Sequence, residues 1–419
     1  SDLGRIVIPY TPRDQQKAIH DLVDHNRFCV VVAHRRMGKT VSAINHLIKA
    51  AVLNTQEAPR YAYIAPTYGQ AKRVAWDYLQ KFTLPLDGTS NISELRVDFW
   101  GRRIQLYGSD NPDSLRGQYF DGVVLDEIGD QNPKIWTDII RPALSDRLGW
   151  CLFIGTPKGR NHFQELRDRA ETEPNWGLLE FKASQTNIIS KEELNAALNE
   201  MGEDKYNQEF ECNFNAAIEG SYYGQILNKL ELDNHIQPIA WDDLCQTFTA
   251  WDLGMGDSTA IWVVQVVGKE VRIMDYHENH GVGLDHYVKW IRDNNYQTAE
   301  HILPHDVQVR ELGSGRSRLE VLQEAGLRVK IAPRMSIDDG IQAVRRLLPR
   351  CYFDPKVKQG LDCLRNYRRE YDEKRQVFYD RPLHDWSSHG SDAFRYLAIG
   401  LDEMSSWTKP INKTPNWIV

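Results

Sequence analysis

A short loop near the start of the chain carries the residue types of a phosphate-binding site. Residues 34–40 read His-Arg-Arg-Met-Gly-Lys-Thr, and they follow an apolar run at residues 28–32. Backbone N–H groups of such a loop, with the start of the helix that follows, can surround phosphate oxygens. Lys39 would place a positive charge on the terminal phosphates, and the hydroxyl of Thr40 can bind Mg²⁺. A buried strand, then Gly38-Lys39-Thr40, then a helix to about residue 51 together predict a nucleotide site.

Two features set this loop apart from the usual pattern. Ala33 stands where a first glycine is usual, and the loop contains two arginines, Arg35 and Arg36. Arginine side chains can stabilise the charge on a transferring phosphoryl group. Arg35 and Arg36 are candidates to do this within one subunit. Arg116, in the sequence Asp-Ser-Leu-Arg-Gly at residues 113–117, is a candidate to reach a neighbouring subunit's nucleotide, and the choice among the three stays open at this stage.

Carboxylates suited to ATP hydrolysis follow a second apolar strand. Residues 122–127 read Gly-Val-Val-Leu-Asp-Glu. Asp126 is placed to hold Mg²⁺, and Glu127 is placed to orient and deprotonate the attacking water. A third apolar run ends in Ile-Gly-Thr-Pro at residues 154–157, where the hydroxyl of Thr156 is a candidate sensor of the γ-phosphate. The same four residues are also typical of an ordinary turn that has no role in binding.

The segment before the first predicted helix could recognise the adenine base. The amide of Gln16 can both donate and accept a hydrogen bond, as the edge of adenine requires. Tyr10 can stack on an aromatic ring, and Arg13 lies beside them in the sequence. We expect Gln16 to contact the base; the alternative is a polar helix start with no ligand.

A separate acidic set lies in the second half of the chain. Asp252 ends one predicted strand, Asp306 follows another, and Asp392 opens the last predicted helix. Three carboxylates that converge repel one another unless cations lie between them. A pair of Mg²⁺ or Mn²⁺ ions would relieve the repulsion and hold a scissile phosphate. Each aspartate alone is more often a turn or cap residue, and Asp392 suits a helix N-cap; their joint placement predicts a metal-dependent nuclease.

Four further side chains are weaker candidates for the same centre. Two are acidic and could be additional metal ligands, namely Asp257 and Glu278. Two are histidines that flank the last motif and could bind metal or phosphate, namely His384 and His389. A single histidine is more often structural than a ligand, so these four remain open.

The spacing of apolar residues predicts the elements that position these side chains. In the first half, strands are expected at 29–33, 61–65, 103–108, 122–126, 150–155 and 177–182, with helices between them at 70–82 and 133–144. Such alternation is typical of a parallel sheet covered by helices. In the second half, three strands in succession (247–252, 259–267 and 270–276) precede a helix at 284–293 and a strand at 300–304. Further helices and strands lead to a final helix at 392–403, which indicates a mixed sheet.

The length of 419 residues exceeds one ordinary hydrophobic core and predicts more than one domain. We expect the domains and their connecting segments to divide as follows: a P-loop ATPase at 1–185, a helical lid or connector at 186–220, a linker at 221–245, a nuclease at 246–404 and a flexible tail at 405–419. Residues 216–240 show little periodicity and contain Gly220, Gly224 and Pro238, which favours a junction there.

Bulk composition narrows the functional classes. The chain has 51 Lys and Arg residues against 58 Asp and Glu residues, a formal charge of −7. A global positive field therefore cannot attract nucleic acid, and any DNA contact must use local basic patches. The 6 cysteines are scattered without a Cys-x-x-Cys pair, which suits a reducing cytoplasm and gives no zinc signature. No apolar run reaches the length of a membrane helix.

With both sets of residues in place, the chain resembles the large terminase subunit of tailed bacteriophages. The parts that carry the resemblance are the loop at 34–40, residues 113–117 and 123–127, residues 154–157, residues 206–214, Trp251-Asp252 and residues 388–396. The resemblance implies an α/β chain in which an N-terminal P-loop ATPase of the RecA-like (ASCE) type, with a parallel-rich sheet, precedes a C-terminal RNase H-like nuclease with a mixed sheet.

The resemblance also implies activity and partners. ATP hydrolysis would drive double-stranded DNA into a procapsid through the portal protein, and the nuclease would cut concatemeric DNA at the start and end of packaging. It assigns Lys39, Thr40, Asp126 and Glu127 to ATP and Mg²⁺, and Asp252, Asp306 and Asp392 to the nuclease metals, Mg²⁺ or Mn²⁺. A ring of identical subunits, a small terminase subunit as partner and the host cell cytoplasm as location follow in the same way, with no membrane partner.

Two other functions compete with this one. A helicase or repair translocase would use its second half only to bind nucleic acid, but no second set of RecA-like motifs appears after residue 220. A scaffold could bind ATP without hydrolysing it. Strand separation on forked DNA distinguishes the first rival, and the effect of replacing Glu127 distinguishes the second.

Overall fold

The computed structural model describes residues 6–254, 258–372 and 374–407. The chain divides into two compact units, residues 1–219 and 220–419. Each unit has its own central sheet and its own buried cores. Within the described ranges, no helix is long and apolar enough to cross a membrane.

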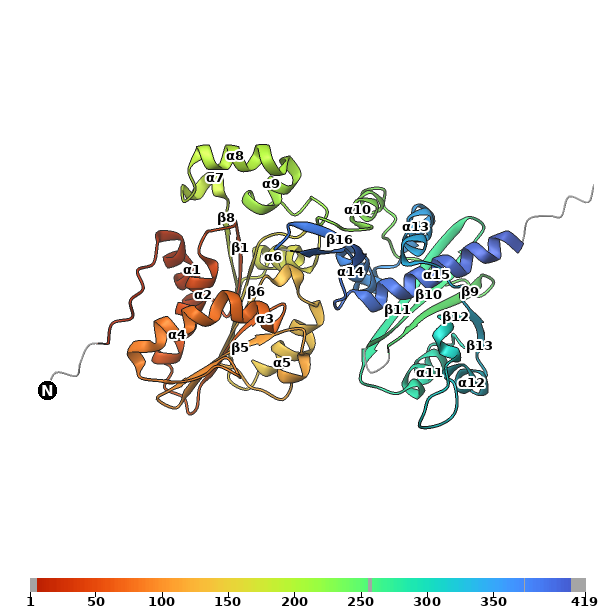
Figure 1. Ribbon diagram of the computed structural model, residues 1–419, viewed down its shortest axis with the longest axis horizontal. Coiled ribbons are helices and arrows are strands. Elements are labelled where there is room, and N and C mark those ends of the chain that lie inside the picture. The colour runs from red at the N-terminus through yellow and green to blue at the C-terminus, as the bar shows by residue number, and fades with distance from the viewer. Residues whose placement is uncertain (1–5, 255–257, 373, 408–419) are drawn as a thin grey trace, which may run out of the picture. The chain divides into compact units, whose positions relative to one another are not determined.

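An eight-stranded sheet with the order β3-β4-β5-β2-β6-β7-β1-β8 forms the centre of the first unit (Figure 1). Its strands are β1 (Phe28–Ala33), β2 (Arg60–Ala65), β3 (Thr89–Asn91), β4 (Arg96–Phe99), β5 (Arg102–Gly108), β6 (Gly122–Asp126), β7 (Trp150–Gly155) and β8 (Trp176–Phe181). The six strands from β5 to β8 in this order run parallel. The predicted parallel sheet is confirmed, and the antiparallel strands β3 and β4 extend it at one edge.

Helices cover both faces of this sheet. They are α1 (Asp14–His25), α2 (Lys39–Leu53), α3 (Tyr68–Ala71), α4 (Asp77–Thr83), α5 (Arg141–Ala143) and α6 (His162–Thr172), with π-helical turns η1 (Lys72–Trp76) and η5 (Ile135–Ile140). Two separate cores result. One contains Ala43, Ile44 and Leu47 of α2, and the other contains Phe163 of α6.

The side chains of β1 show how one strand serves both cores. Cys29, Val31 and Ala33 lie in the core beneath α2. Phe28, Val30 and Val32 lie in the core on the opposite face. A strand with both faces buried has a continuous run of apolar residues in its sequence. The apolar run before the loop therefore predicts β1 well. The carboxyl end of this strand is therefore rigid where the loop begins.

A small helical segment follows β8. It contains α7 (Ala183–Thr186), α8 (Lys191–Met201) and α9 (Glu203–Phe210). Ala183, Leu194 and Phe210 form its own small core. The loop is attached to this segment because His34 Nε2 lies 2.7 Å from Thr186 Oγ1 of α7, and the Arg35 backbone N–H donates to the Glu209 carbonyl of α9 at 3.0 Å.

The second unit is built on a six-stranded mixed sheet with the order β13-β12-β9-β10-β11-β14. The strands are β9 (Gln246–Leu253), β10 (Ser258–Val267), β11 (Glu270–His280), β12 (Glu300–Leu303), β13 (Arg328–Ile331) and β14 (Cys351–Phe353), and a separate hairpin comprises β15 (Arg369–Asp372) and β16 (Val377–Pro382). Strands β9, β10 and β11 form the predicted antiparallel meander. Strand β12 adds parallel to β9.

Helices lie on both faces of this second sheet (Figure 1). They are α10 (Gly224–Leu232), α11 (Leu284–Asp293), α12 (Arg318–Glu324), α13 (Ile337–Leu347), α14 (Lys358–Asn366) and α15 (Ser388–Trp407). Helix α15 packs on β9 and β10. It begins at Ser388, four residues before the predicted start, so Asp392 lies in its second turn and is not the N-cap that its sequence suits.

The stretch 221–245, expected as a linker, contains helix α10. Leu227 and Leu230 of this helix are buried in the same core as Trp262 of β10. Tyr223, which precedes the helix, is also fully buried there. This stretch therefore packs as part of the second unit.

Candidate nucleotide and metal sites

The turn that ends the loop depends on a glycine. Gly38 has φ 91° and ψ 30° and caps the start of α2, a left-handed conformation that costs an L-residue energy. A Cβ at Gly38 would lie 2.8 Å from the Gln16 amide nitrogen and 2.9 Å from a guanidinium nitrogen of Arg13. Both the backbone angle and the close approach thus require glycine here.

Lys39 and Thr156 meet although they lie far apart in the sequence. The Lys39 Nζ donates to Thr156 Oγ1 at 3.1 Å and to the His34 carbonyl at 3.4 Å. Thr156 Oγ1 donates to the Ala33 carbonyl at 3.3 Å. Both side chains are buried. The ends of β1 and β7, which are neighbours in the sheet, bring them together.

Asp126 and Glu127 stand at the carboxyl end of β6. Asp126 is buried, and its Oδ1 accepts the Glu127 backbone N–H at 2.9 Å. Glu127 has φ 47°, which is uncommon for a residue other than glycine and costs about 1 kcal/mol or more. Burial raises the pKa of Asp126 against the lowering effects of a Tyr63 hydrogen bond and the Lys39 charge. Burial also raises the pKa of Glu127, although the charge of Lys39 lowers it in part.

One polar side chain in this site gave no signal in the sequence. Tyr63 lies in the middle of β2 and is fully buried. Its hydroxyl donates to Asp126 Oδ2, and the neighbouring Thr40 side chain acts to lower the pKa of this hydroxyl, which burial raises. Thr40 and Asp126, the two predicted Mg²⁺ ligands, therefore both lie beside one phenol.

Gln16, the predicted adenine-binding residue, contacts the loop itself. The Gln16 amide donates to the Gly38 carbonyl at 3.2 Å and accepts the Arg13 backbone N–H at 2.9 Å. The Tyr10 hydroxyl is 2.9 Å from His20 Nε2. Gln16 is buried and supports the turn at Gly38 in this structure. Its contact with a base stays a prediction.

The three candidate arginines lie in different surroundings. Arg35 Nε is 2.7 Å from the buried carboxylate of Glu209 in α9, and the Arg35 backbone N–H donates to the Glu209 carbonyl at 3.0 Å. Arg36 is exposed, with φ 63°. Arg116 is exposed and lies 3.7 Å from Asp113. Only Arg35 therefore has a partner on the helical segment that follows the sheet, among the interactions that the described residues make.

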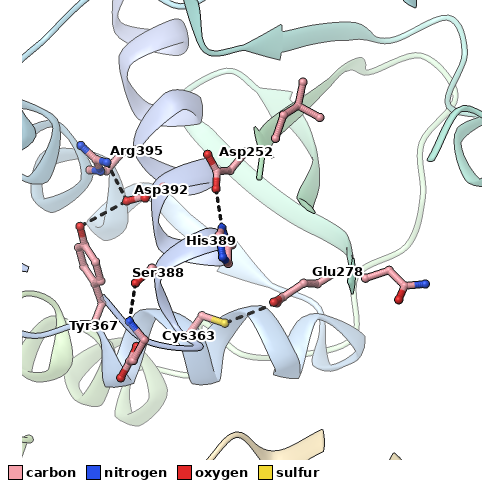
Figure 2. Close-up of polar contacts among 12 residues, drawn as sticks. Asp252, Glu278, Cys363, Tyr367, Ser388, His389, Asp392 and Arg395 are labelled. Atoms are coloured by element: carbon pink, nitrogen blue, oxygen red, sulfur yellow. Dashed lines mark hydrogen bonds and ion pairs between the residues drawn. The ribbon is translucent and has the colours of Figure 1, made fainter. Parts of the chain in front are cut away.

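Side chains of three neighbouring strands are in register where the predicted acidic set of the second unit lies. Asp252 of β9 pairs with Ala260 of β10, and Ala260 pairs with Glu278 of β11. Residues directly opposite in antiparallel strands point to the same face. Asp252 and Glu278 thus share a face, with the small side chain of Ala260 between them. Figure 2 shows His389 of α15 between these two carboxylates.

His389 is the closest polar partner of Asp252. Its Nδ1 lies 3.0 Å from Asp252 Oδ2, and each side chain is about 15% exposed or less. Burial raises the pKa of Asp252, the charges of Asp392 and Asp306 raise it further, and the His389 hydrogen bond lowers it. Burial lowers the pKa of His389, but the hydrogen bond to Asp252 and the charge of Glu278 raise it overall.

Asp392 is held by two partners on its outer side (Figure 2). Its Oδ1 accepts a hydrogen bond from Arg395 at 2.7 Å, one turn along α15. The Tyr367 hydroxyl donates to the same oxygen at 3.4 Å. These contacts fix the orientation of Asp392 and compensate part of its charge.

Asp306 comes to the same edge from β12. It lies in the 3₁₀ turn η6 (His305–Gln308) and is exposed. Its charge raises the pKa of Asp252 and of Tyr396, as does that of Asp392. The three predicted aspartates are therefore electrostatic neighbours. Within the described residues, no group of three or more His, Cys, Asp or Glu side chains is close enough to hold a metal ion without movement.

The remaining candidates differ in position. Glu278 is buried and accepts hydrogen bonds from the Tyr276 hydroxyl at 2.6 Å and from Gln359 at 3.3 Å. The exposed ring of His384 lies edge-on to His389, with 5.8 Å between centroids. Asp257 lies outside the described residues.

Comparisons with known proteins point to one family. The chain is 22% identical over 416 residues to the large terminase subunit of Escherichia phage T5, covering 92% of this chain and 90% of that protein. It is 30% identical over 181 residues to the large terminase subunit of Thermus phage G20c, covering 38% of this chain and 36% of that protein. No protein-family model matches the chain.

Solved structures of large terminases were also found. That of a thermophilic bacteriophage matches with 17% identity and a TM-score of 0.43, covering 92% of this chain and 98% of that one. The HK97 bacteriophage large terminase matches with 12% identity and a TM-score of 0.47, covering 96% of each chain. The near full-length match to the T5 subunit and the order of the motifs both point to the large terminase subunits of phages, the family that the sequence resembles.

Proposed function

We propose that this protein is the motor and nuclease of phage DNA packaging. ATP hydrolysis in the first unit drives double-stranded DNA into a procapsid, and the second unit cuts concatemeric DNA with two Mg²⁺ or Mn²⁺ ions. The observation that carries the proposal is the presence of both residue sets in one chain, each gathered at one edge of its own sheet.

The ATPase part rests on the convergence of separate loops. Lys39, Asp126 and Thr156 follow the carboxyl ends of β1, β6 and β7, which are parallel neighbours. Ligands of open parallel sheets bind at that edge. Lys39 would bind the terminal phosphates, Thr156 would contact the γ-phosphate, and Glu127 would orient and deprotonate water.

The donor set beside the loop fits Mg²⁺. The Thr40 hydroxyl and the Asp126 carboxylate are hard oxygen ligands that both lie beside the buried phenol of Tyr63, and such ligands suit Mg²⁺. Bound there, the ion would neutralise phosphate charge. The residues of the chain supply its position, and Lys39 supplies the second positive charge.

The nuclease part rests on Asp252, Asp306 and Asp392. Their mutual effect on the pKa of Asp252 indicates a local excess of negative charge, which divalent cations would relieve. Asp392 is already oriented by Arg395 and Tyr367. A small movement of exposed Asp306 toward the other two would complete the set of ligands.

The three candidate arginines receive separate roles in this proposal. Arg35 joins the loop to Glu209 of α9 in this structure, so we assign it the role of reporting phosphate occupancy to that helix. Arg36 is exposed at the loop and is assigned to the γ-phosphate of its own subunit. Arg116, exposed in the connection between β5 and β6, is assigned to a neighbouring subunit in a ring.

A packaging assay tests the whole proposal. Purified protein, procapsids with portal, small terminase subunit and linear DNA are incubated with ATP, and DNA protected from added nuclease is measured. Protection is expected with the native chain and not with Lys39→Ala. Robust separation of forked DNA strands without protected DNA would instead favour the helicase. The packaging assembly would act in the cytoplasm of the infected host.

A further inference from the structure

A tyrosine hydroxyl is buried where the two predicted Mg²⁺ ligands of the ATPase site meet. Tyr63 pairs in register with Val124 of β6, and Asp126 lies two residues further along that strand on the same face. Helix α2 packs against β2 and β6 on this face. Asp126 therefore accepts a hydrogen bond from the phenol, and the side chain of Thr40, in the first turn of α2, is also a neighbour of the phenol.

The hydroxyl of Tyr63 is unnecessary for packing. Its ring lies in the apolar core with Ala43, Ile44 and Val124, and phenylalanine would fill the same space. A buried hydroxyl without a partner costs about 1–3 kcal/mol. The position of this hydroxyl between a carboxylate and a threonine therefore calls for a role beyond core packing.

The direction of the two hydrogen bonds follows from the chemistry of the groups. An ionised carboxylate only accepts, so the Tyr63 hydroxyl donates to Asp126. Its single proton is then used, so in any hydrogen bond between Thr40 and the phenol oxygen the Thr40 hydroxyl is the donor. The Thr40 hydroxyl is left with its lone pairs available, and Asp126 Oδ2 is held by the phenol while Oδ1 is held by the Glu127 N–H.

We propose that Tyr63 is a positioning residue for the ATPase cation, because its phenol orders Thr40 and Asp126 through the chain Thr40→Tyr63→Asp126. The proposal rests on the proposed ATPase function of the first unit. Tyr63 touches neither nucleotide nor water in this role. It sets which lone pairs the two ligands present to Mg²⁺.

Tyr61 provides a matched control on the same strand. It is buried on the same face of β2, and its hydroxyl is also hydrogen-bonded, to Asn54 at 2.9 Å and the Ala50 carbonyl at 3.2 Å. Those partners belong to the far end of α2 and the residue after it. Tyr61→Phe thus removes a hydrogen-bonded tyrosine hydroxyl from the same strand without touching Thr40 or Asp126.

The test measures binding of the fluorescent nucleotide mant-ATP to the full chain, first with EDTA and then across a Mg²⁺ titration. Tyr63→Phe is expected to raise the Mg²⁺ concentration for half-maximal enhancement about tenfold, the loss of one charged hydrogen bond. Affinity without Mg²⁺ should stay within about twofold of the native value. Tyr61→Phe should match the native protein in both measurements.

Two outcomes overturn the idea in different ways. If Tyr63→Phe and Tyr61→Phe give the same Mg²⁺ dependence, Tyr63 has no positioning role and the ATPase proposal is untouched. If the native chain shows no Mg²⁺-dependent nucleotide binding at all, the ATPase proposal fails and this inference fails with it. Tyr63→Met, which also lacks a hydroxyl, replaces the phenylalanine variant should that variant not fold, and the same comparison with Tyr61→Phe then decides.

Discussion

Glu127 combines an unfavourable backbone angle with an unfavourable charge. The φ of 47° makes folding less favourable, and so does the burial of the carboxylate that raises the pKa of Glu127. Strain of this kind gathers at functional positions. Replacement by glutamine keeps the shape and removes the base, so ATP hydrolysis should fall at least about 100-fold while nucleotide still binds. Turnover by phosphate release and binding by mant-ATP fluorescence check both parts.

The same substitution should also change stability with pH. Because burial raises the pKa of Glu127 above its usual value of 4.5, folding favours the protonated side chain, and ionisation destabilises the fold as the pH rises. Glu127→Gln should therefore melt at a higher temperature than the native chain at about pH 8, and the difference should shrink toward about pH 4. Glu192→Gln, an exposed change in α8, is the control. A melting difference independent of pH would contradict this account.

Asp252 is the aspartate whose pKa the other two predicted aspartates both raise at the proposed nuclease site. It is hydrogen-bonded to His389 and lies near the charges of Asp306 and Asp392. Asp252→Asn should abolish DNA cutting in Mg²⁺ or Mn²⁺, because a neutral amide is a poor ligand for hard cations, and should leave ATP hydrolysis at the native rate. Asp275→Asn, a carboxylate of β11 held by the Tyr296 hydroxyl, controls for stability. Plasmid nicking by Asp252→Asn at the native rate would show that the site is assigned wrongly.

Helix α15 brings two side chains of the nuclease site to the sheet through one glycine. Gly390 lies between His389 and Asp392, and its carbonyl accepts the Trp262 indole N–H at 2.8 Å. A Cβ there would lie 2.5 Å from the Tyr276 hydroxyl and 3.0 Å from Cys363. Gly390→Ala should push the start of α15 away from the sheet and destabilise the fold by about 1–3 kcal/mol. It should also reduce the rate of DNA cutting by the protein that remains folded.

A second glycine of the same helix supplies the control. A Cβ at Gly400 would lie 2.8 Å from the end of the flexible Ile302 side chain, far along α15 from Asp392. Gly400→Ala should cost stability but keep nuclease activity in the folded protein. Chemical unfolding and plasmid nicking at matched folded fractions compare the two variants. Equal loss of nicking in both would show that α15 tolerates movement at its start.

The elements themselves were largely predictable, and the contacts between them were not. Strand β6 was evident because an apolar run with both faces buried ends in two acids. Tyr63 gave no local signal, since its role depends on the register of β2 against β6. The Arg35–Glu209 pair joins residues far apart in the sequence, and the start of α15 at Ser388 depends on packing against β9 and β10. Local patterns determine elements, while tertiary contacts select which polar groups meet.

At the level of the whole chain, each of the two units has its own central sheet and its own hydrophobic cores. The first unit has its cores on both faces of the eight-stranded sheet, and the second has its cores on both faces of the six-stranded sheet. Units with separate cores can fold separately. A chain cut between Glu219 and Gly220 should therefore give an N-terminal piece that binds mant-ATP and a C-terminal piece that cuts DNA without ATP.

Coupling between the units is the property that the cut should remove. In the full chain, DNA is expected to stimulate ATP hydrolysis, because the proposed nuclease unit and the proposed ATPase unit are joined by one polypeptide. The mixed pieces should each keep their own activity, while DNA no longer stimulates ATP turnover. Phosphate release with and without DNA, measured on the full chain and on the two pieces together, decides this. Full stimulation in the mixture would mean that the units associate without the covalent link, and that the junction at Glu219 carries no coupling of its own.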